Sequence, residues 1–299
     1  MSNLKAESTT TNGFNIYPSS FVCFEDALKS DKLSIYNLLH LSSLRDRDTL
    51  PDRAEYHRRL VELMSSKLER VENSSPVGFV WTVDNQDYDS TSLMFELYFT
   101  SLSLAQKLFQ SQDNYDASIH LLKQCRAMLS AWKTSELVYP SCPYVCTDEY
   151  VKNLLYVVNG SKLLKMRGKQ EAVALSSAMK CSGNVSYHIP YFSDIALNHY
   201  LAARALLFQH LALKNKENLE QGDMANQSYT SAKEALETCK LVDRSKCHMD
   251  TNLDSALNKL LEEIPEYITT MQQVYYAVDT PLNSITIPAS ISNDKIEAR

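Results

Sequence analysis

Hydrophobic positions recur at intervals of three and four residues along most of the chain, a spacing that places side chains on one face of an α-helix. The clearest case begins after Ser92, where two apolar stripes run together. The stripes comprise Leu93, Leu97, Leu104 and Leu108 on one side and Phe95, Phe99, Leu102 and Phe109 on the other. A helix that is apolar over so much of its surface is packed between neighbours. We therefore predict a central helix at about 92–112.

The same periodicity predicts helices on both sides of this segment. Their approximate ranges are 51–70, 115–133, 148–166, 169–181, 191–215, 223–241 and 253–275. We expect the helices at 115–133 and 191–215 to flank the central one. Pro265 is expected to interrupt the last helix, because proline lacks an N–H and clashes with the preceding turn. Residues 14–24 are predicted to be extended.

The predicted helices are joined by mostly short loops, without a linker long enough to separate domains. We predict a single helical domain over 14–279, between a disordered N-terminus at 1–13 and an irregular tail at 280–299. No segment fits the tetratricopeptide pattern and no fixed period emerges. The expected fold is all-α, an irregular tetratricopeptide-like stack of about ten helices with a small β element near the N-terminus.

Composition agrees with a helical fold and narrows the function. Of 299 residues, 44% are hydrophobic, which suffices for a buried core, and the 6 glycines are fewer than sheet-rich folds need. The net charge of −6 provides no general attraction for nucleic acid. We expect a cytoplasmic protein with reduced cysteines, because the sequence shows neither a secretory signal nor an apolar run that could span a membrane.

The sequence shows no familiar motif for catalysis or metal binding. Gly168 and Lys169 lack the upstream glycine and the hydroxyl residue of a phosphate-binding loop. Cys142 and Cys146 lie four residues apart, but no second pair stands at zinc-ligand spacing. The helical histidines have no evident Ser or Cys partner. We therefore expect no catalytic residue, metal, cofactor or small-molecule substrate.

One motif resembles a known family. The sequence "FVWTVD" at 79–84 is followed by a polar gap and by "STSLMFELYFTSLSLAQ" at 90–106. This order resembles the hallmark of the Bro domain family of endosomal-sorting proteins, in which a Trp-containing loop and a Ser-rich turn precede a helix that begins with a Phe-Glu pair. The matching residues are Phe79, Trp81, Asp84, Phe95 and Glu96. The resemblance implies that these residues are structural, with the Trp loop packed against the start of the central helix.

The resemblance extends over roughly 20–290. Segments 41–68 and 115–132 are similar to the helices on either side of the family's Trp loop, and 273–288 is similar to its closing segment. Segment 153–173 stands where the family has an Ala-Gln-Ala-Gln helix, but this chain does not keep those residues. The chain is also shorter than family members between 166 and 195.

In the family, the Bro domain binds the C-terminal amphipathic helix of an ESCRT-III subunit in a shallow apolar groove, a helix-in-groove mode of recognition. The resemblance thus implies a non-enzymatic adaptor of endosomal sorting that is recruited peripherally to endosomal membranes. Alternatives are a scaffold of the same fold in pH or Rho-linked signalling, a tetratricopeptide-like adaptor unrelated to endosomes, and an enzyme without a familiar motif.

The resemblance also suggests which residues bind. The family's groove positions, placed on this chain without gaps, coincide with Met166 and Met179, and helical spacing adds Leu163 and Leu175. Methionine suits an adaptable apolar surface, and nearby lysines could meet acidic residues of a partner helix. The predicted partner-binding set is Leu163, Met166, Leu175, Met179, Lys162 and Lys165. Both methionines should then be exposed on one face; the alternative is that they are core residues beside a solvated lysine-rich face.

Overall fold

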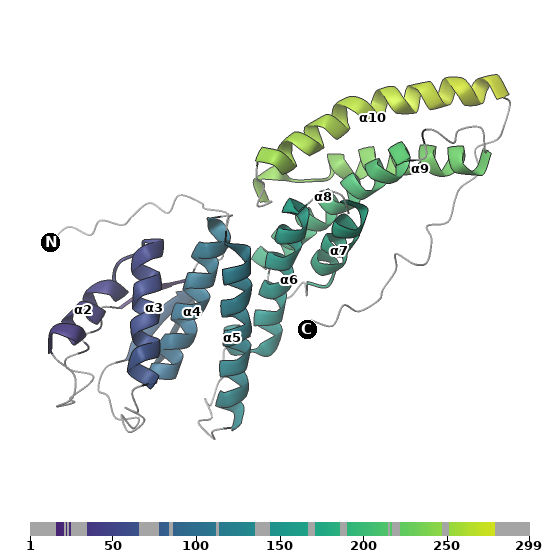
Figure 1. Cartoon of the computed structure of the whole chain (residues 1–299). Helices are drawn as coiled ribbons and strands as arrows, with labels where there is room; N and C mark the ends of the chain where they lie inside the picture. The colour runs from purple at the N-terminus through teal and green to yellow at the C-terminus, as the bar shows by residue number, and fades with distance from the viewer. Residues whose placement is uncertain are drawn as a thin grey trace. The chain divides into compact units, whose positions relative to one another are not determined.

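The computed structural model describes thirteen stretches of the chain. They are residues 16–20, 22, 24, 35–65, 78–83, 86–111, 114–134, 144–166, 171–185, 190–214, 216, 222–246 and 251–278. Within these stretches the chain forms nine α-helices and one three-stranded sheet (Figure 1). This confirms the predicted all-α fold with a small β element near the N-terminus. The predictions for 1–13, 280–299 and Asp84 lie outside the described residues.

The chain divides into two compact units. Unit 1 is Met1–Leu155 and unit 2 is Tyr156–Arg299. The boundary falls within α6 (Asp148–Lys165), which begins in unit 1 and ends in unit 2. The single domain over 14–279 stays a prediction.

Unit 1 is built around α4 (Leu93–Gln110). Its other elements are β1 (Ile16–Pro18), α2 (Ile35–Arg45), α3 (Leu50–Ser65), β2 (Phe79–Val83), β3 (Gln86–Ser90), α5 (Tyr115–Thr134) and the 3-10 helix η1 (Tyr144–Cys146). Helix α4 packs against α3, α5, β1 and β2. Phe99 and Leu104 are buried and Leu97 is half-buried, so the double apolar stripe does mark the central helix of this unit.

The start of α4 is fixed by a side-chain cap. The hydroxyl of Ser92 accepts a hydrogen bond from the backbone N–H of Met94 at 3.2 Å, which satisfies a donor that has no partner within the helix. The prediction that 191–215 flanks this helix stays a prediction. Helix α8 (Pro190–Lys214) belongs to unit 2, where it packs against α7, α9 and α10.

The sheet corrects the prediction of a Trp loop. Residues 79–83 form the central strand β2, which pairs antiparallel with β1 on one side and with β3 on the other. The run Phe-Val-Trp-Thr-Val consists of aromatic and β-branched residues, which are enriched in strands. The extended segment predicted at 14–24 contains β1, in which Tyr17 pairs with Thr82.

A buried carboxylate joins four elements of unit 1. Glu96, in the first turn of α4, is 0% exposed. Its Oε1 accepts hydrogen bonds from Arg45 Nε of α2 at 2.8 Å and from the Tyr56 hydroxyl of α3 at 2.7 Å. Its Oε2 accepts one from Trp81 Nε1 of β2 at 2.7 Å. Arg45 also donates to the carbonyl of Val80 at 3.2 Å, so both charges keep hydrogen-bond partners in place of water.

Aromatic rings pack around Phe99, which lies three residues after Glu96 in α4. The ring of Phe99 lies 4.5 Å from that of Phe95, 5.9 Å from Trp81 and 5.4 Å from Tyr98. Such ring pairs add stability beyond the apolar area that they bury. Burial raises the pKa of Tyr56 well above its usual value, and the negative charge of Glu96 adds to the rise. The hydroxyl therefore stays protonated and remains a donor.

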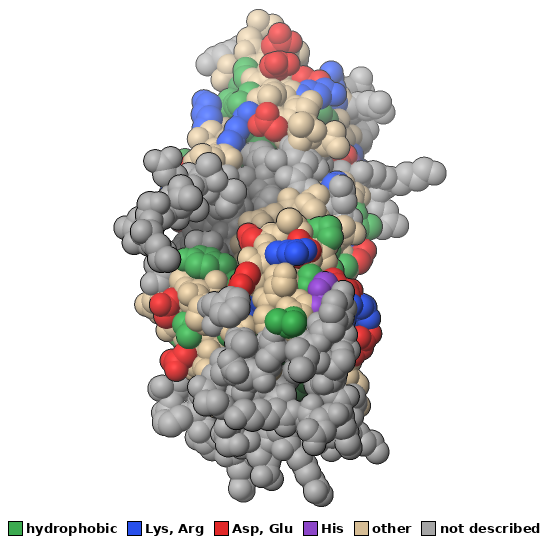
Figure 2. Space-filling view, turned by 90° about the vertical axis from the view of Figure 1, so that its left-hand side faces the viewer, with side chains coloured by type: hydrophobic (Ala, Val, Ile, Leu, Met, Phe, Trp, Pro, Cys, Tyr) green, Lys and Arg blue, Asp and Glu red, His purple; other side chains and the backbone are tan. Residues whose placement is uncertain are grey.

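The outer surface of unit 1 carries mixed charge. On α3, Glu55 accepts hydrogen bonds from Arg58 at 2.8 Å and from Arg59 at 2.6 Å. Acidic and basic side chains are interspersed on the face shown in Figure 2. Exposed pairs of this kind contribute little to stability.

Unit 2 is a stack of helices with small residues at its centre. It comprises the end of α6, then α7 (Glu171–Gly183), α8, α9 (Gly222–Lys240), the 3-10 helix η3 (Arg244–Lys246) and α10 (Thr251–Val278). Helix α8 packs against α7 and α9, and α10 packs against both α8 and α9. Buried alanines such as Ala202, Ala205 and Ala232 bring α8 and α9 close together, and leucines of α10 cover them.

Helix α10 continues through Pro265, contrary to the predicted interruption. The physical reason is tertiary packing. Its apolar face is buried on both sides of the proline, at Leu260 and Ile264 before it and at Tyr267 and Met271 after it. Burial on both sides of the proline outweighs the loss of one backbone hydrogen bond.

We expect Trp81→Ala to lower the free energy of unfolding by about 3–5 kcal/mol, because it removes a fully buried ring. Trp81→Phe keeps a ring but removes the N–H that binds Glu96, and should cost about 1–3 kcal/mol. Urea unfolding followed by circular dichroism measures both. Neither variant should lose partner binding selectively. A Trp81→Ala variant with an unchanged unfolding midpoint would contradict this role.

Candidate functional site

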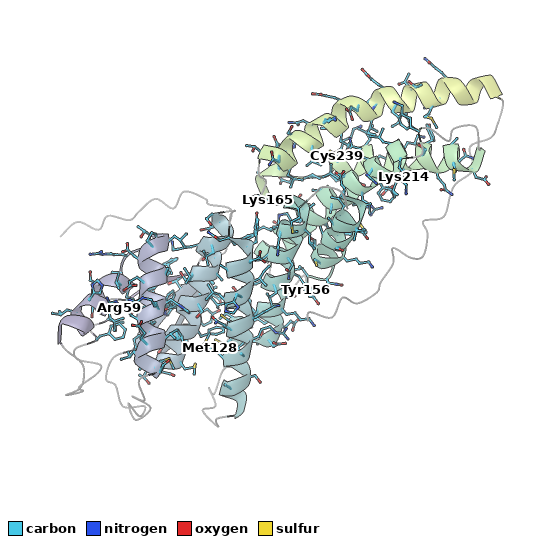
Figure 3. All side chains as sticks on the ribbon, in the orientation of Figure 1. Arg59, Met128, Tyr156, Lys165, Lys214 and Cys239 are labelled. Atoms are coloured by element: carbon cyan, nitrogen blue, oxygen red, sulfur yellow. The ribbon has the colours of Figure 1, made fainter. Side chains whose placement is uncertain are left out.

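The predicted binding residues of α6 lie on the surface of unit 2. Met166 is 61% exposed, and Lys165 is exposed at the end of α6 (Figure 3). Lys162 and Leu163 are half-buried. The backbone N–H of Met166 donates to the carbonyl of Lys162 at 3.0 Å, so helical spacing continues to Met166. Residues 162, 163 and 166 therefore share one face.

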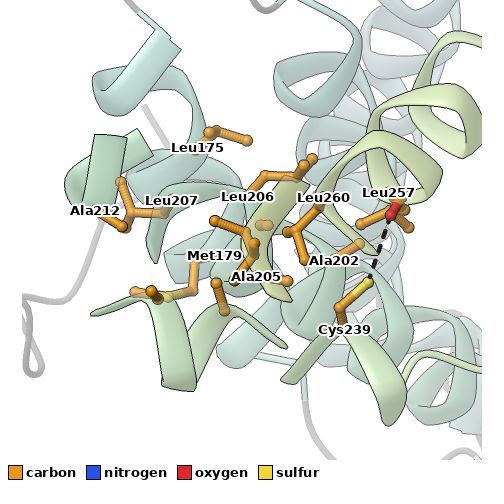
Figure 4. Close-up of a cluster of buried hydrophobic side chains, with 14 of the residues drawn as sticks. Leu175, Met179, Ala202, Ala205, Leu206, Leu207, Ala212, Cys239, Leu257 and Leu260 are labelled. Carbon is orange, nitrogen blue, oxygen red and sulfur yellow. Dashed lines mark hydrogen bonds between the residues drawn. The ribbon is translucent and has the colours of Figure 1, made fainter. Parts of the chain in front are cut away.

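The predicted binding residues of α7 are core residues instead. Leu175 is 0% exposed and Met179 is 7% exposed, so the expectation that both methionines are exposed was wrong for Met179. Both side chains lie in a buried cluster with Leu206 and Leu207 of α8 (Figure 4). The physical reason is that α7 turns its apolar stripe toward α8.

The structure exposes a different apolar side chain on α7. Val173, in the first turn of the helix, is 63% exposed. Val173 lies two positions before the buried Leu175. Residues two apart point to different sides of a helix, so this spacing could have indicated that Val173 is exposed. The resemblance pointed to Leu175 and Met179 on this helix and to Leu163 and Met166 before it, so the predicted binding set did not include Val173.

A glycine sets how closely α6 approaches α7. A Cβ atom at Gly160 would lie 2.7 Å from the hydroxyl oxygen of Ser182 and 3.7 Å from the carbonyl oxygen of Ala178. Only a residue without a side chain fits there without a shift. Gly160 thus lets α6 lie directly against Ala178 and Ser182 of α7.

The charge on this surface is basic at the end of α6. Lys162 and Lys165 stand in its last turn, where positive side chains also complement the negative end of the helix dipole. The last turn thus provides two positive charges close to an exposed methionine. Such a surface can attract an acidic segment while the apolar side chains supply contact area.

Two histidines have serine partners that were not evident from the sequence. His57 Nε2 lies 3.0 Å from the hydroxyl of Ser101 in unit 1. His199 Nδ1 lies 3.2 Å from the hydroxyl of Ser161 in unit 2, where both side chains are buried. Sequence spacing could not reveal either pair, because each joins two different helices.

Each of these serine hydroxyls also has a backbone carbonyl that can accept its proton. Ser101 donates its hydroxyl proton to the carbonyl of Leu97 at 2.7 Å, and Ser161 donates to the carbonyl of Val157 at 3.0 Å. A serine that gives its proton to its own helix can only accept from the ring. Activation of a nucleophile needs the reverse arrangement, with the ring accepting the hydroxyl proton.

The described cysteines are buried, and burial favours the protonated form of a thiol. Cys125, Cys146, Cys181 and Cys239 are buried. Burial raises the pKa of Cys181 to about 11 and raises that of Cys125 further, so these thiols stay protonated at neutral pH. Cys142 lies outside the described residues. Among the residues described, no three metal-ligating side chains gather at one point, and no helix is both long and apolar enough to cross a membrane.

Comparison with known proteins identifies the fold through structure alone. No family model matches the sequence, and no curated protein matches it. A solved structure described as "ALIX BRO1 CHMP4C complex" matches 92% of this chain and 93% of its own chain, with a TM-score of 0.57 and 10% identity. A structure of ALIX in complex with the SIVmac239 PYKEVTEDL late domain matches 91% of this chain, with a TM-score of 0.57 and 12% identity. This chain spans 46% of that ALIX chain.

The chain therefore has a Bro1-like fold. The matches cover more than nine tenths of the chain and therefore reach into both units. This agrees with the resemblance at Phe79, Trp81, Phe95 and Glu96, all of which are buried.

We expect Gly160→Val to destabilise the protein by about 1–3 kcal/mol, because the new side chain overpacks the contact between α6 and α7. Gly183→Ala is the matched control. A Cβ atom there would lie 3.5 Å from the Tyr200 ring, which is an ordinary contact. Thermal unfolding compares the two variants, and equal midpoints would contradict the close approach at Gly160.

The stability of the protein should depend on pH through His57. Burial lowers the pKa of His57, so the folded protein keeps the ring neutral where the unfolded chain takes up a proton. The contribution of His57 to stability is present in full above about pH 6.5 and is lost as the pH falls below that value. His57→Gln should reduce this loss in urea titrations at a series of pH values. The exposed His120 provides a control, and His120→Gln should retain it.

Proposed function

We propose that this protein is a non-enzymatic adaptor of endosomal sorting that binds the C-terminal amphipathic helix of an ESCRT-III subunit. The observation that carries the proposal is the Bro1-like fold, which matches a solved complex of the ALIX BRO1 domain with CHMP4C over 92% of this chain. On this proposal the protein works in the cytoplasm, and its partner recruits it to the surface of endosomes.

The binding surface that we propose lies at the end of α6 and the start of α7. It keeps Lys162, Leu163, Lys165 and Met166 from the predicted set and adds Val173. Leu175 and Met179 support it from within, because they hold α7 against α8. We call this set of five residues the α6–α7 surface.

The chemistry of the α6–α7 surface suits an amphipathic helix with acidic residues beside its apolar face. Met166 and Val173 present flexible and branched apolar side chains that a partner can cover. Desolvated apolar contacts carry most of the binding energy in such interfaces. The two lysines raise the association rate and add a salt-dependent contribution.

The test is a titration of the full chain with the C-terminal peptide of an ESCRT-III subunit. Met166→Asp should weaken binding at least tenfold, or about 1.4 kcal/mol, because it places a charge where the apolar face docks. Lys165→Glu should have a smaller effect that fades at high salt. Isothermal titration calorimetry at two salt concentrations measures both.

Met224 offers a matched control. It is 37% exposed on α9 of the same unit and is not part of the α6–α7 surface. Met224→Asp should bind as the wild type does. Equal affinity for Met166→Asp in a folded protein overturns the surface. No binding by the wild type overturns the ESCRT-III partner and favours a scaffold role in another pathway.

A further inference from the structure

The small sheet of unit 1 has two edges that differ in their hydrogen bonding. The strand order is β1-β2-β3, so β1 and β3 are both edge strands. An edge strand presents a row of backbone N–H and C=O groups that another strand can use. Natural proteins close such edges with proline, with side chains or with a covering element.

The edge at β1 is closed. The backbone N–H of Ile16 donates to Gln106 Oε1 at 3.1 Å, and its carbonyl accepts from the hydroxyl of Ser103 at 3.2 Å. Both partners are side chains of α4. Pro18 follows in the strand and has no N–H to offer. In the described strand β1, the outward groups of Ile16 are therefore already bound and Pro18 offers no donor to a further strand.

The edge at β3 is open. Val83 pairs with Gln86, and only two residues separate them along the chain. In a hairpin with a two-residue loop, the residues that flank the loop form a hydrogen-bonded pair, so Val83 and Gln86 form such a pair. Pairs of this type alternate along antiparallel strands, so Tyr88 faces β2 while the backbone groups of Asp87 and Asp89 point away from it. Among the described residues, no backbone or side-chain hydrogen bond reaches these outward groups.

The same edge is acidic on one face. The ring of Tyr88 stacks on that of Phe99 at 6.2 Å, so Tyr88 points toward α4. Side chains alternate along a strand, so Asp87 and Asp89 lie on the other face, and both are exposed. Two carboxylates therefore accompany the open backbone groups.

The charges decide which strand this edge can accept. A second copy of β3 pairing antiparallel across it would set Asp87 opposite Asp89, and like charges directly opposite are destabilising. A strand with Lys or Arg at alternate positions would place opposite charges there instead. The edge thus rejects its own copy and favours a basic segment.

We propose that the outer edge of β3 binds an extended basic segment of another protein as a fourth, antiparallel strand. The backbone groups of Asp87 and Asp89 supply the hydrogen bonds, and their carboxylates select alternating Lys or Arg. This site is separate in sequence and chemistry from the α6–α7 surface and does not rest on the ESCRT-III proposal.

The test uses the full chain and a fluorescent peptide of sequence Thr-Lys-Val-Lys-Val-Lys-Thr, titrated by fluorescence anisotropy. We expect saturable binding that Asp89→Lys weakens by about tenfold, through the loss of one attraction and the gain of one repulsion. A peptide with Glu in place of Lys should not bind the wild type and should bind the Asp89→Lys variant more tightly.

Two further measurements separate strand addition from simple charge attraction. Asp89→Asn removes the charge but keeps the outward N–H, whereas Asp89→Pro removes both and leaves the ladder to β2 intact. The proline variant should therefore bind more weakly than the asparagine variant by about fivefold. The Lys peptide methylated on alternate backbone nitrogens, in the register that faces β3, should lose most of its affinity.

The outcomes are distinct. Equal binding of the methylated and unmethylated peptides would overturn strand addition, even if the proline variant fails to fold. An edge whose acidic residues only prevent aggregation would bind neither peptide, and that result would also overturn the proposal. Met166→Asp should leave binding of the Lys peptide unchanged, so failure here and failure of the ESCRT-III proposal can be told apart.

Discussion

The buried carboxylate of Glu96 is the constraint on which the arrangement of unit 1 depends. Its two oxygens accept hydrogen bonds from Arg45, Tyr56 and Trp81, which come from α2, α3 and β2. A buried charge without these partners would be strongly destabilising, so the elements must assemble together around it. The hydrogen bonds also fix orientation, because each donor must reach one side of a planar group on α4.

Unit 2 is held by a different kind of contact. Small residues such as Ala202, Ala205 and Gly160 let helix backbones approach closely, and leucines fill the space around them. The stability of such a close-packed core depends on the fit between apolar side chains and not on charge. Few interior positions therefore tolerate a larger side chain. It also turns Leu175 and Met179 inward, which limits the proposed α6–α7 surface to the residues that this packing leaves outside.

The two proposed binding surfaces follow from these two ways of packing. In unit 2, a helix packed on one side leaves Met166 and Val173 exposed beside lysines. In unit 1, the sheet is anchored through β1 and β2 to α4, so the backbone of β3 is left at the edge. A helix-binding surface and a strand-binding edge use different chemistry.

The sequence by itself determined the helical class, the position of α4 and the resemblance at Trp81 and Glu96, because periodicity and local motifs are properties of neighbouring residues. Local patterns could not show that Pro265 stays within a helix, that Met179 faces α8, or that Ser161 meets His199. Each of these depends on which helix packs against which. Burial and pairing between distant segments were decided only by the tertiary structure, since a side chain's exposure is set by the element that covers it.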